Sequence, residues 1–300
     1  MSRRIEIVEV GPRDGLQNEK TLLEVGDKLE MIHRLETAGA RRMEVVSFVN
    51  PKRVPQMAGA EEIMAALPHK DGRSRIGLVL NMRGWERCLY AGCDEANVVV
   101  CASDSFGIRN QGASVDEQVT TLANIMGARR KEDPPVSVTV SVAFGCPFEG
   151  EVPEDRVVNI VKAAADLRVA EIALADTIGV ADPWTVRKRI EAARKAAGNI
   201  PLRLHFHDTR STGLANAFAG VEAGVDILDA SVGGLGGCPF APNATGNIGT
   251  EDLVYMLERA GFATGYDLDQ LIEIGNWASR LLGKRVASSV ARAGGFLAGT

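Results

Sequence analysis

Two histidines separated by one residue have the types and the spacing that a metal site needs. His205 and His207 lie in the strand-like run Leu204-His205-Phe206-His207-Asp208. Side chains at positions i and i+2 of a β-strand point to the same face, so we expect both imidazoles to converge on one point, as two ligands of one metal ion must. Taken alone, the spacing fits a buried histidine pair without a metal, or a solvated strand edge, at least as well.

A second segment supplies a carboxylate and a guanidinium. Arg13 and Asp14 lie in Gly11-Pro12-Arg13-Asp14-Gly15-Leu16-Gln17, where glycines on both sides permit a tight turn and close approach of the backbone to a ligand. Asp14 could bind a metal ion, and Arg13 could stabilise an oxyanion. On its own, an ordinary turn with an exposed Arg–Asp pair is the simpler interpretation.

A glycine-rich loop carries a cysteine and is followed by an asparagine. Four of the five residues 233–237 are glycine, Cys238 comes next, and Asn247 follows nine residues later. Such a loop can close over a substrate, and we interpret Cys238 as a chemical residue rather than a buried, inert one. Two histidines, one aspartate and one asparagine form a mixed N/O donor set that suits Mg²⁺ or Mn²⁺, with Zn²⁺ as the alternative.

Short β-branched runs alternate with amphipathic stretches along the whole chain. The predicted strands are residues 5–10, 42–47, 76–80, 96–101, 136–142, 171–175, 202–207 and 226–232; predicted helices include 24–38, 115–130, 154–167, 183–197, 213–223, 251–259 and 268–282. Eight such units predict an α/β fold, a single (β/α)8 TIM barrel with extra C-terminal helices, rather than a doubly wound sheet. We expect one catalytic domain over 1–300, with the barrel at about 5–260 and a helical extension at about 261–300.

This fold would bring the polar residues to one rim, because chemistry in TIM barrels takes place at the carboxyl ends of the strands. The residues at or near those ends are Arg13, Asp14, Glu44, Asp176, His205, His207, Cys238 and Asn247. The composition excludes other classes of function. A net charge of -5 gives no footprint for nucleic acid, and no apolar run approaches the roughly 20 residues that cross a membrane. Five cysteines without a disulfide or zinc-type spacing, and a first strand that begins at once, predict a cytoplasmic protein.

Several segments together resemble the 3-hydroxy-3-methylglutaryl-CoA (HMG-CoA) lyase family, within the group of metal-dependent lyases and pyruvate-carboxyltransferase-like TIM barrels. They are residues 10–19, 47–52, 145–150, 176–179, 205–209 and the loop 233–247. The resemblance implies that a divalent cation is bound by Asp14, His205, His207 and Asn247. It implies a catalytic set of Arg13, Asp14, Glu44, Asp176, His205 and Cys238, with Gln17, Asn110, Thr209, Gly236 and Gly237 at the substrate or around the metal. It also implies an acyl-CoA substrate and a homodimer.

The chemistry implied is a retro-Claisen cleavage to a keto acid and an acyl-CoA enolate. Arg13 would polarise the thioester carbonyl, and Cys238 would protonate the enolate. Two alternatives stay open: a Claisen-type synthase or aldolase of the same superfamily, and a barrel that binds CoA esters without turnover. Cys238 separates the lyase from the synthase, since the synthases of this group lack the cysteine loop.

Some positions depart from the family pattern where the acyl pocket is expected. Ser137, Val138 and Thr139 replace an Arg-Gly-Tyr run, Ala173 and Ala175 replace a serine and a glycine, and Arg210-Ser211, Asn243 and Asn110-Gln111-Gly112 also differ. The proposed chemical residues all match. We therefore expect the same reaction on a substrate with a different or bulkier acyl chain.

Overall fold

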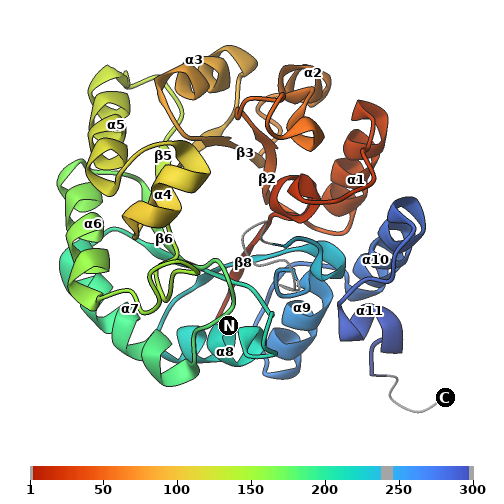
Figure 1. Cartoon of the computed structure of the whole chain (residues 1–300). Coiled ribbons are helices and arrows are strands. Elements are labelled where there is room, and N and C mark those ends of the chain that lie inside the picture. The colour runs from red at the N-terminus through yellow and green to blue at the C-terminus, as the bar shows by residue number, and fades with distance from the viewer. Residues whose placement is uncertain (1–2, 238–245, 297–300) are drawn as a thin grey trace.

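Eight parallel strands close into a barrel in the order in which they occur along the chain. The computed structural model describes residues 3–237 and 246–296. Helices surround the strands on the outside (Figure 1), which confirms the predicted (β/α)8 TIM barrel.

The strands are β1 (Glu6–Glu9), β2 (Arg42–Ser47), β3 (Ser74–Val79), β4 (Glu95–Cys101), β5 (Val136–Ser141), β6 (Glu171–Asp176), β7 (Leu202–Phe206) and β8 (Ile227–Ala230). The helices are α1 (Val25–Thr37), α2 (Ala60–Ala66), α3 (Met82–Ala91), α4 (Asp104–Gln111), α5 (Val115–Ala128), α6 (Glu154–Asp166), α7 (Pro183–Ala197), α8 (Gly213–Glu222), α9 (Thr250–Arg259), α10 (Leu268–Leu282) and α11 (Ser289–Ala293). Strands β1 and β8 are shorter than predicted, because helical turns at Gly11–Gly15 and Val232–Gly234 follow them closely. The first of these replaces the tight turn that the sequence suggested.

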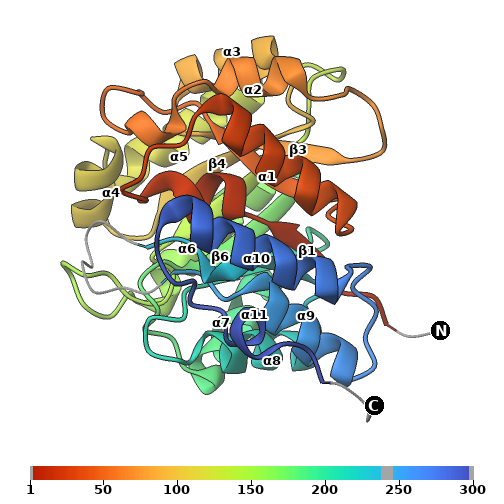
Figure 2. The ribbon, with the colours of Figure 1, turned by 90° about the vertical axis from the view of Figure 1, so that its right-hand side faces the viewer.

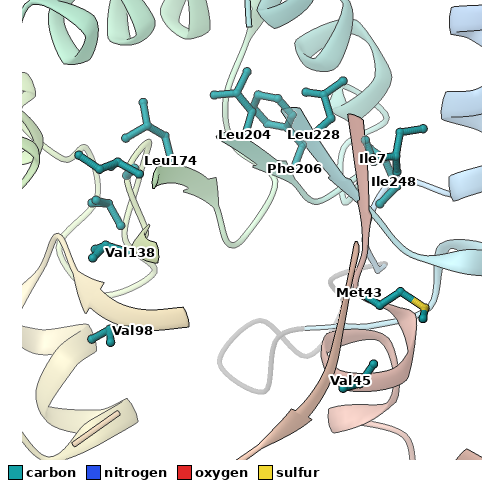
Figure 3. Packing of buried hydrophobic residues seen from close by; sticks show 14 of the residues in the cluster. Ile7, Met43, Val45, Val98, Val138, Leu174, Leu204, Phe206, Leu228 and Ile248 are labelled. Atoms are coloured by element: carbon teal, nitrogen blue, oxygen red, sulfur yellow. The ribbon is translucent and has the colours of Figure 1, made fainter. Parts of the chain in front are cut away.

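Alternation along the strands separates the outer core from the barrel interior. Figure 3 shows Val138, Leu174, Leu204 and Leu228 on the helix-facing side of the strands, and all four are buried. Since the side-chain period of a strand is two, the neighbours of these residues point into the barrel. The interior therefore receives residues 137, 139, 173, 175, 203, 205 and 229, which are mostly polar or small.

Charged side chains fill part of the barrel interior, where branched apolar residues usually predominate. The Arg42 guanidinium donates to both oxygens of Glu95, at 3.0 and 2.8 Å, and to both oxygens of Glu171, at 2.8 Å each. Ser137 Oγ also donates to Glu95, at 2.5 Å. Because these groups come from β2, β4, β5 and β6, the network joins strands that are not all neighbours.

The C-terminal extension contains α10 and α11. Helix α10, whose first turn is capped by the Asp267 side chain, lies outside the barrel between α1 and α9 (Figure 2). The segment before α11 reaches the turn after β8, since the N–H groups of Ala287 and Ser288 donate to the carbonyl oxygen of Gly233 at 2.9 and 3.0 Å. The extension therefore supports the start of the glycine-rich loop. Among the described residues, no helix has the length and apolar character that a membrane span requires.

Candidate active site

Asp14, His205 and His207 meet at the carboxyl ends of the strands. One potential ligand atom from each of the three lies within 4.8 Å of the others, and the two imidazole centroids are 5.2 Å apart. His205 belongs to β7, and His207 follows its last residue and pairs with Asn247 in an isolated bridge. The two histidines thus converge, as their spacing predicts, and the helical turn after β1 brings the carboxylate to them.

The polar atoms around this cluster fit a bound cation. Asn247 Nδ2 donates to Asp14 Oδ2 at 2.8 Å and to the carbonyl oxygen of Leu235 at 3.0 Å. Asn247 Oδ1 and His207 Nδ1 are buried without a hydrogen-bond partner in the part of the chain that the structure describes. A buried polar atom without a partner is costly, so the donor set Asp14, His205, His207 and Asn247 suits a divalent ion that accepts N and O ligands.

Asp229, at the end of β8, orients His205. His205 Nδ1 lies 3.1 Å from Asp229 Oδ2. With the proton on Nδ1 and donated to this carboxylate, the Nε2 lone pair is left for a metal, an arrangement typical of metal-binding histidines. The sequence analysis did not single out Asp229. The signal that could have found it is a carboxylate between apolar residues of a predicted strand, Leu228 and Ala230.

The charges around Asp14 favour its ionised form. Burial disfavours the carboxylate, but Arg13 and the two imidazoles outweigh this effect, so the pKa of Asp14 is held well below its ordinary value. Arg13 Nη1 donates to Asp14 Oδ1 at 2.8 Å. Burial, with the nearby charge of His205, lowers the pKa of His207 to about 4. The neutral imidazole of His207 beside the Asp14 carboxylate suits a metal site. Burial lowers the pKa of His205, but Asp229, with Asp14, raises it by more, so a cation bound here would displace a proton from His205.

Arg13 is held between two carboxylates. Besides Asp14, its guanidinium pairs with Glu44, and Glu44 in turn accepts a hydrogen bond from Asn97 Nδ2 at 2.7 Å. Gln17 Oε1 lies 3.4 Å from Arg13 Nη1. All five of these side chains line one cavity, so a partly buried cation is fixed at its wall. Asn97 is a second site residue that the sequence analysis missed.

This cavity has a volume of about 430 Å³ and two chemically different walls. The wall formed after β1, β7 and β8 carries Arg13, Asp14, His205, His207 and Asp229. The lining formed around β2, β3, β4 and α4 mixes apolar side chains with polar ones; the apolar ones include Phe48, Val49, Leu78, Leu80, Val99 and Phe106, and the polar ones include Asn50, Arg53, Asn81 and Gln111. The cavity can therefore hold a molecule that has anionic or oxygen-rich groups beside the metal cluster and that offers both apolar and polar contacts elsewhere.

The other predicted site residues lie in different places. Asn110 of α4 and Gly237 line the cavity, whereas Gly236 packs so closely on Asn247 that a Cβ at this position would lie 2.6 Å from Asn247 Nδ2. Asp176 is fully buried and accepts the N–H groups of Val180 and Ala181, each at 2.9 Å. Burial raises the pKa of Asp176.

Asp176 therefore shapes the loop after β6 and does not line the cavity. Thr209 packs against Gly179 of that loop, also away from the cavity lining. Cys238, like Asn243, lies outside the described residues.

Only some of the departures from the family pattern reach the cavity. Thr139, Ala175, Asn110 and Gln111 line it. Ser137 instead joins the interior charge network, and Ala173 is buried among the strands. Arg210 donates to the carbonyl oxygens of Ile178 and Gly179, at 3.0 and 2.8 Å. The expectation that all these positions shape the acyl pocket was therefore too broad.

Comparison with known proteins places the chain in a family. The sequence profile of the HMGL-like family matches residues 4–277. A 3-hydroxy-3-isohexenylglutaryl-CoA/hydroxymethylglutaryl-CoA lyase of Pseudomonas aeruginosa is 38% identical over 98% of both chains. An (R)-citramalyl-CoA lyase of Chloroflexus aurantiacus is 40% identical over 97% of this chain and 95% of its own length.

A solved structure of similar size supports the same assignment. It is an HMG-CoA lyase from Acinetobacter baumannii in complex with coenzyme A and 3-methylmalate, with a TM-score of 0.95 and 37% identity over 99% of this chain and 97% of that one. The family profile matches most of the chain, and the relatives are similar over nearly their full length. The chain therefore belongs to the HMGL-like family of carbon–carbon lyases.

Proposed function

We propose that this protein is a divalent-cation-dependent acyl-CoA lyase that cleaves HMG-CoA, or a close analogue with another C3 substituent, to a keto acid and acetyl-CoA. The observation that carries the proposal is the cluster of Asp14, His205 and His207 beside the fixed guanidinium of Arg13 in one cavity. The family membership and the lyase names of the relatives support the reaction class.

Asp14, His205, His207 and Asn247 would hold the cation, Mg²⁺ or Mn²⁺ in preference to Zn²⁺. When bound, such an ion supplies a Lewis acid for the oxygens of the substrate. Asp14 contributes the negative charge of the site. Asn247 contributes an uncharged oxygen that has no other partner in the described chain.

Arg13 would stabilise the charge that develops on the thioester oxygen. Its guanidinium is aligned before substrate binds, because Asp14 and Glu44 hold it from two sides and Asn97 fixes Glu44. A preorganised cation of this kind costs no reorganisation when the enolate forms. Breaking the C–C bond requires that the substrate hydroxyl lose its proton and that the enolate carbon gain one. Cys238 stays the predicted donor for the second transfer.

Apolar side chains in the cavity support a substrate with an apolar branch. Phe48, Leu78 and Val99 line the cavity, and Thr139 stands where the family pattern has a tyrosine. The names of the Pseudomonas and Chloroflexus relatives indicate that proteins of this similarity act on different branched acyl-CoA esters. We therefore keep HMG-CoA and C3 analogues as the substrate class. A homodimer and a cytoplasmic location also stay part of the proposal.

A panel of 3-hydroxyacyl-CoA esters tests the proposal. Enzyme stripped of metal with a chelator is given Mg²⁺ or Mn²⁺, and the keto acid and acyl-CoA products are measured by chromatography. We expect cleavage that depends on the added cation, with Asp14→Asn inactive under the same conditions. Equal rates with and without chelator would refute the metal dependence. Condensation of acetyl-CoA with a keto acid, without measurable cleavage, would favour the synthase alternative.

A further inference from the structure

A buried arginine lies directly beneath the metal ligands. Arg203 of β7 is two residues before His205, so both side chains point into the barrel, and the Arg203 side chain is completely buried. Its Nη1 donates to Asp229 Oδ1 at 3.2 Å, and its Nε lies 3.0 Å from Glu171 Oε1. The mechanism described above makes no use of this residue.

The contacts of Asp229 connect Arg203 to the metal site. One carboxylate oxygen of Asp229 accepts from Arg203, and the other lies 3.1 Å from His205 Nδ1. With one oxygen fixed to the guanidinium, the second oxygen has a defined direction toward the imidazole. Arg203 also offsets the charge of a carboxylate that is itself buried, and a buried charge is stable only when paired.

Other cations of the barrel interior cannot take over this contact. Arg42 is committed to Glu95 and Glu171 through four hydrogen bonds, and no hydrogen bond joins it to Asp229 in the described chain. Arg13 lies at the cavity wall and pairs with Asp14 and Glu44. The orientation of Asp229 toward His205 therefore depends on Arg203.

We propose that Arg203 is a positioning residue for the catalytic cation, acting through Asp229 to set the direction of the ligand His205. This inference rests on the proposed metal site of Asp14, His205, His207 and Asn247. Groups around metal ligands typically change metal affinity by roughly 10- to 100-fold when they are removed. The same range is expected here, although Arg203 does not touch the metal site directly.

Mn²⁺ binding to the metal-stripped full-length enzyme, followed by the electron paramagnetic resonance signal of the free ion, tests the inference. The variants are Arg203→Met, Asp229→Asn and the double variant. Arg75→Met is the matched control, because Arg75 is also a buried, ion-paired strand arginine, held by Glu36 and Asp71 at 2.6 and 2.9 Å. Thermal unfolding of each stripped protein reports structural damage separately.

We expect Arg203→Met to raise the Kd for Mn²⁺ by about 10- to 100-fold, and the Arg75→Met variant to bind as wild type does even if its Tm falls. The double variant should bind no more weakly than Asp229→Asn, since both changes break the same connection. Excess Mn²⁺ should restore kcat in the Arg203→Met variant. Equal affinity of Arg203→Met and Arg75→Met, or multiplicative losses in the double variant, would overturn the inference.

Two further outcomes are informative. If Arg203→Met does not fold, Arg203→Lys keeps the charge but loses the forked donor, and it should weaken Mn²⁺ binding while Tm stays near that of wild type; wild-type affinity would then refute the proposal. If the wild-type enzyme binds no Mn²⁺, the proposed metal site is wrong and this inference fails with it. That result is distinct from one in which the wild-type enzyme binds Mn²⁺ and the Arg203 variants bind it with the same affinity.

Discussion

Replacing Glu251 with glutamine should remove a loss of stability that the wild-type protein suffers as pH rises. Glu251 of α9 is completely buried. Both of its carboxylate oxygens accept a hydrogen bond from the backbone N–H of Gly233, and each lies 2.9 Å from that nitrogen. Burial raises the pKa of Glu251 from 4.5 to about 8, against the lowering effect of its hydrogen bonds. The folded protein therefore keeps this carboxyl protonated at neutral pH, whereas the unfolded chain ionises it.

The magnitude follows from proton linkage. Between the unfolded and folded pKa values the folded state binds more protons at this carboxyl, so the contribution of Glu251 to stability is fully present below pH 4.5 and falls as pH rises toward about 8. From about pH 5.5 to about pH 7.5 the loss is about 2.5 kcal/mol, or about 2 kcal/mol if the folded pKa is one unit lower. Glutamine cannot ionise, so the variant should gain this amount relative to wild type over the same range.

Urea unfolding at the two pH values, followed by far-ultraviolet circular dichroism, measures the effect. Glu9, whose pKa burial raises to about 7, titrates in the same range; since it is present in both proteins, only its repulsion of an ionised Glu251 remains in the difference. Glu154→Gln, at an exposed position at the start of α6, is the control and should show no such change. A difference between wild type and Glu251→Gln that stays constant from about pH 5.5 to about pH 7.5 would refute this account.

The other predictions concern the site itself. Cys238→Ser should keep Mn²⁺ binding and most substrate affinity but lose several powers of ten in kcat, because a hydroxyl is a far weaker acid than a thiol. Cys88→Ser is its control, since Cys88 is buried outside the cavity and should affect stability only; equal activity of Cys238→Ser and wild type would remove the main support for the lyase over the synthase. Arg13→Met should lower kcat by roughly 10²- to 10³-fold as measured with saturating Mn²⁺ at a temperature where thermal unfolding shows the variant to be folded, and a change confined to KM would contradict its role at the enolate oxygen. Across a panel of acyl-CoA esters, an analogue with another C3 substituent should have a higher kcat/KM than HMG-CoA. A tenfold or greater preference for HMG-CoA would instead mean that Thr139 and Ala175 are neutral changes.

Residues whose role depends on local spacing could be predicted from the sequence. The alternation of β-branched runs and amphipathic stretches is a local signal, and it was enough for the barrel. The i, i+2 spacing of His205 and His207 was enough for their convergence. Asp14 and Asn247 follow strands, and the barrel brings the carboxyl ends of all strands to one rim.

Residues whose role depends on side-chain direction or on contacts across the barrel could not be predicted. Asp176 ends a strand as expected, but its carboxylate turns to the amides of Val180 and Ala181. The roles of Arg203 and Asp229 depend on the contact between them, and they lie 26 residues apart in the sequence. Such pairings are fixed by the register and closure of the whole sheet, which no local pattern contains.

The anchor of Gly233 has a consequence for how changes far from the cavity could affect it. The carbonyl oxygen of Gly233 accepts from Ala287 and Ser288, and its N–H donates to Glu251. Residues 287 and 288 contribute no strand and no proposed metal ligand, and they do not line the cavity. A substitution in the segment before α11 should therefore alter the turn after β8, and through it the start of the glycine-rich loop, without changing any side chain of the cavity.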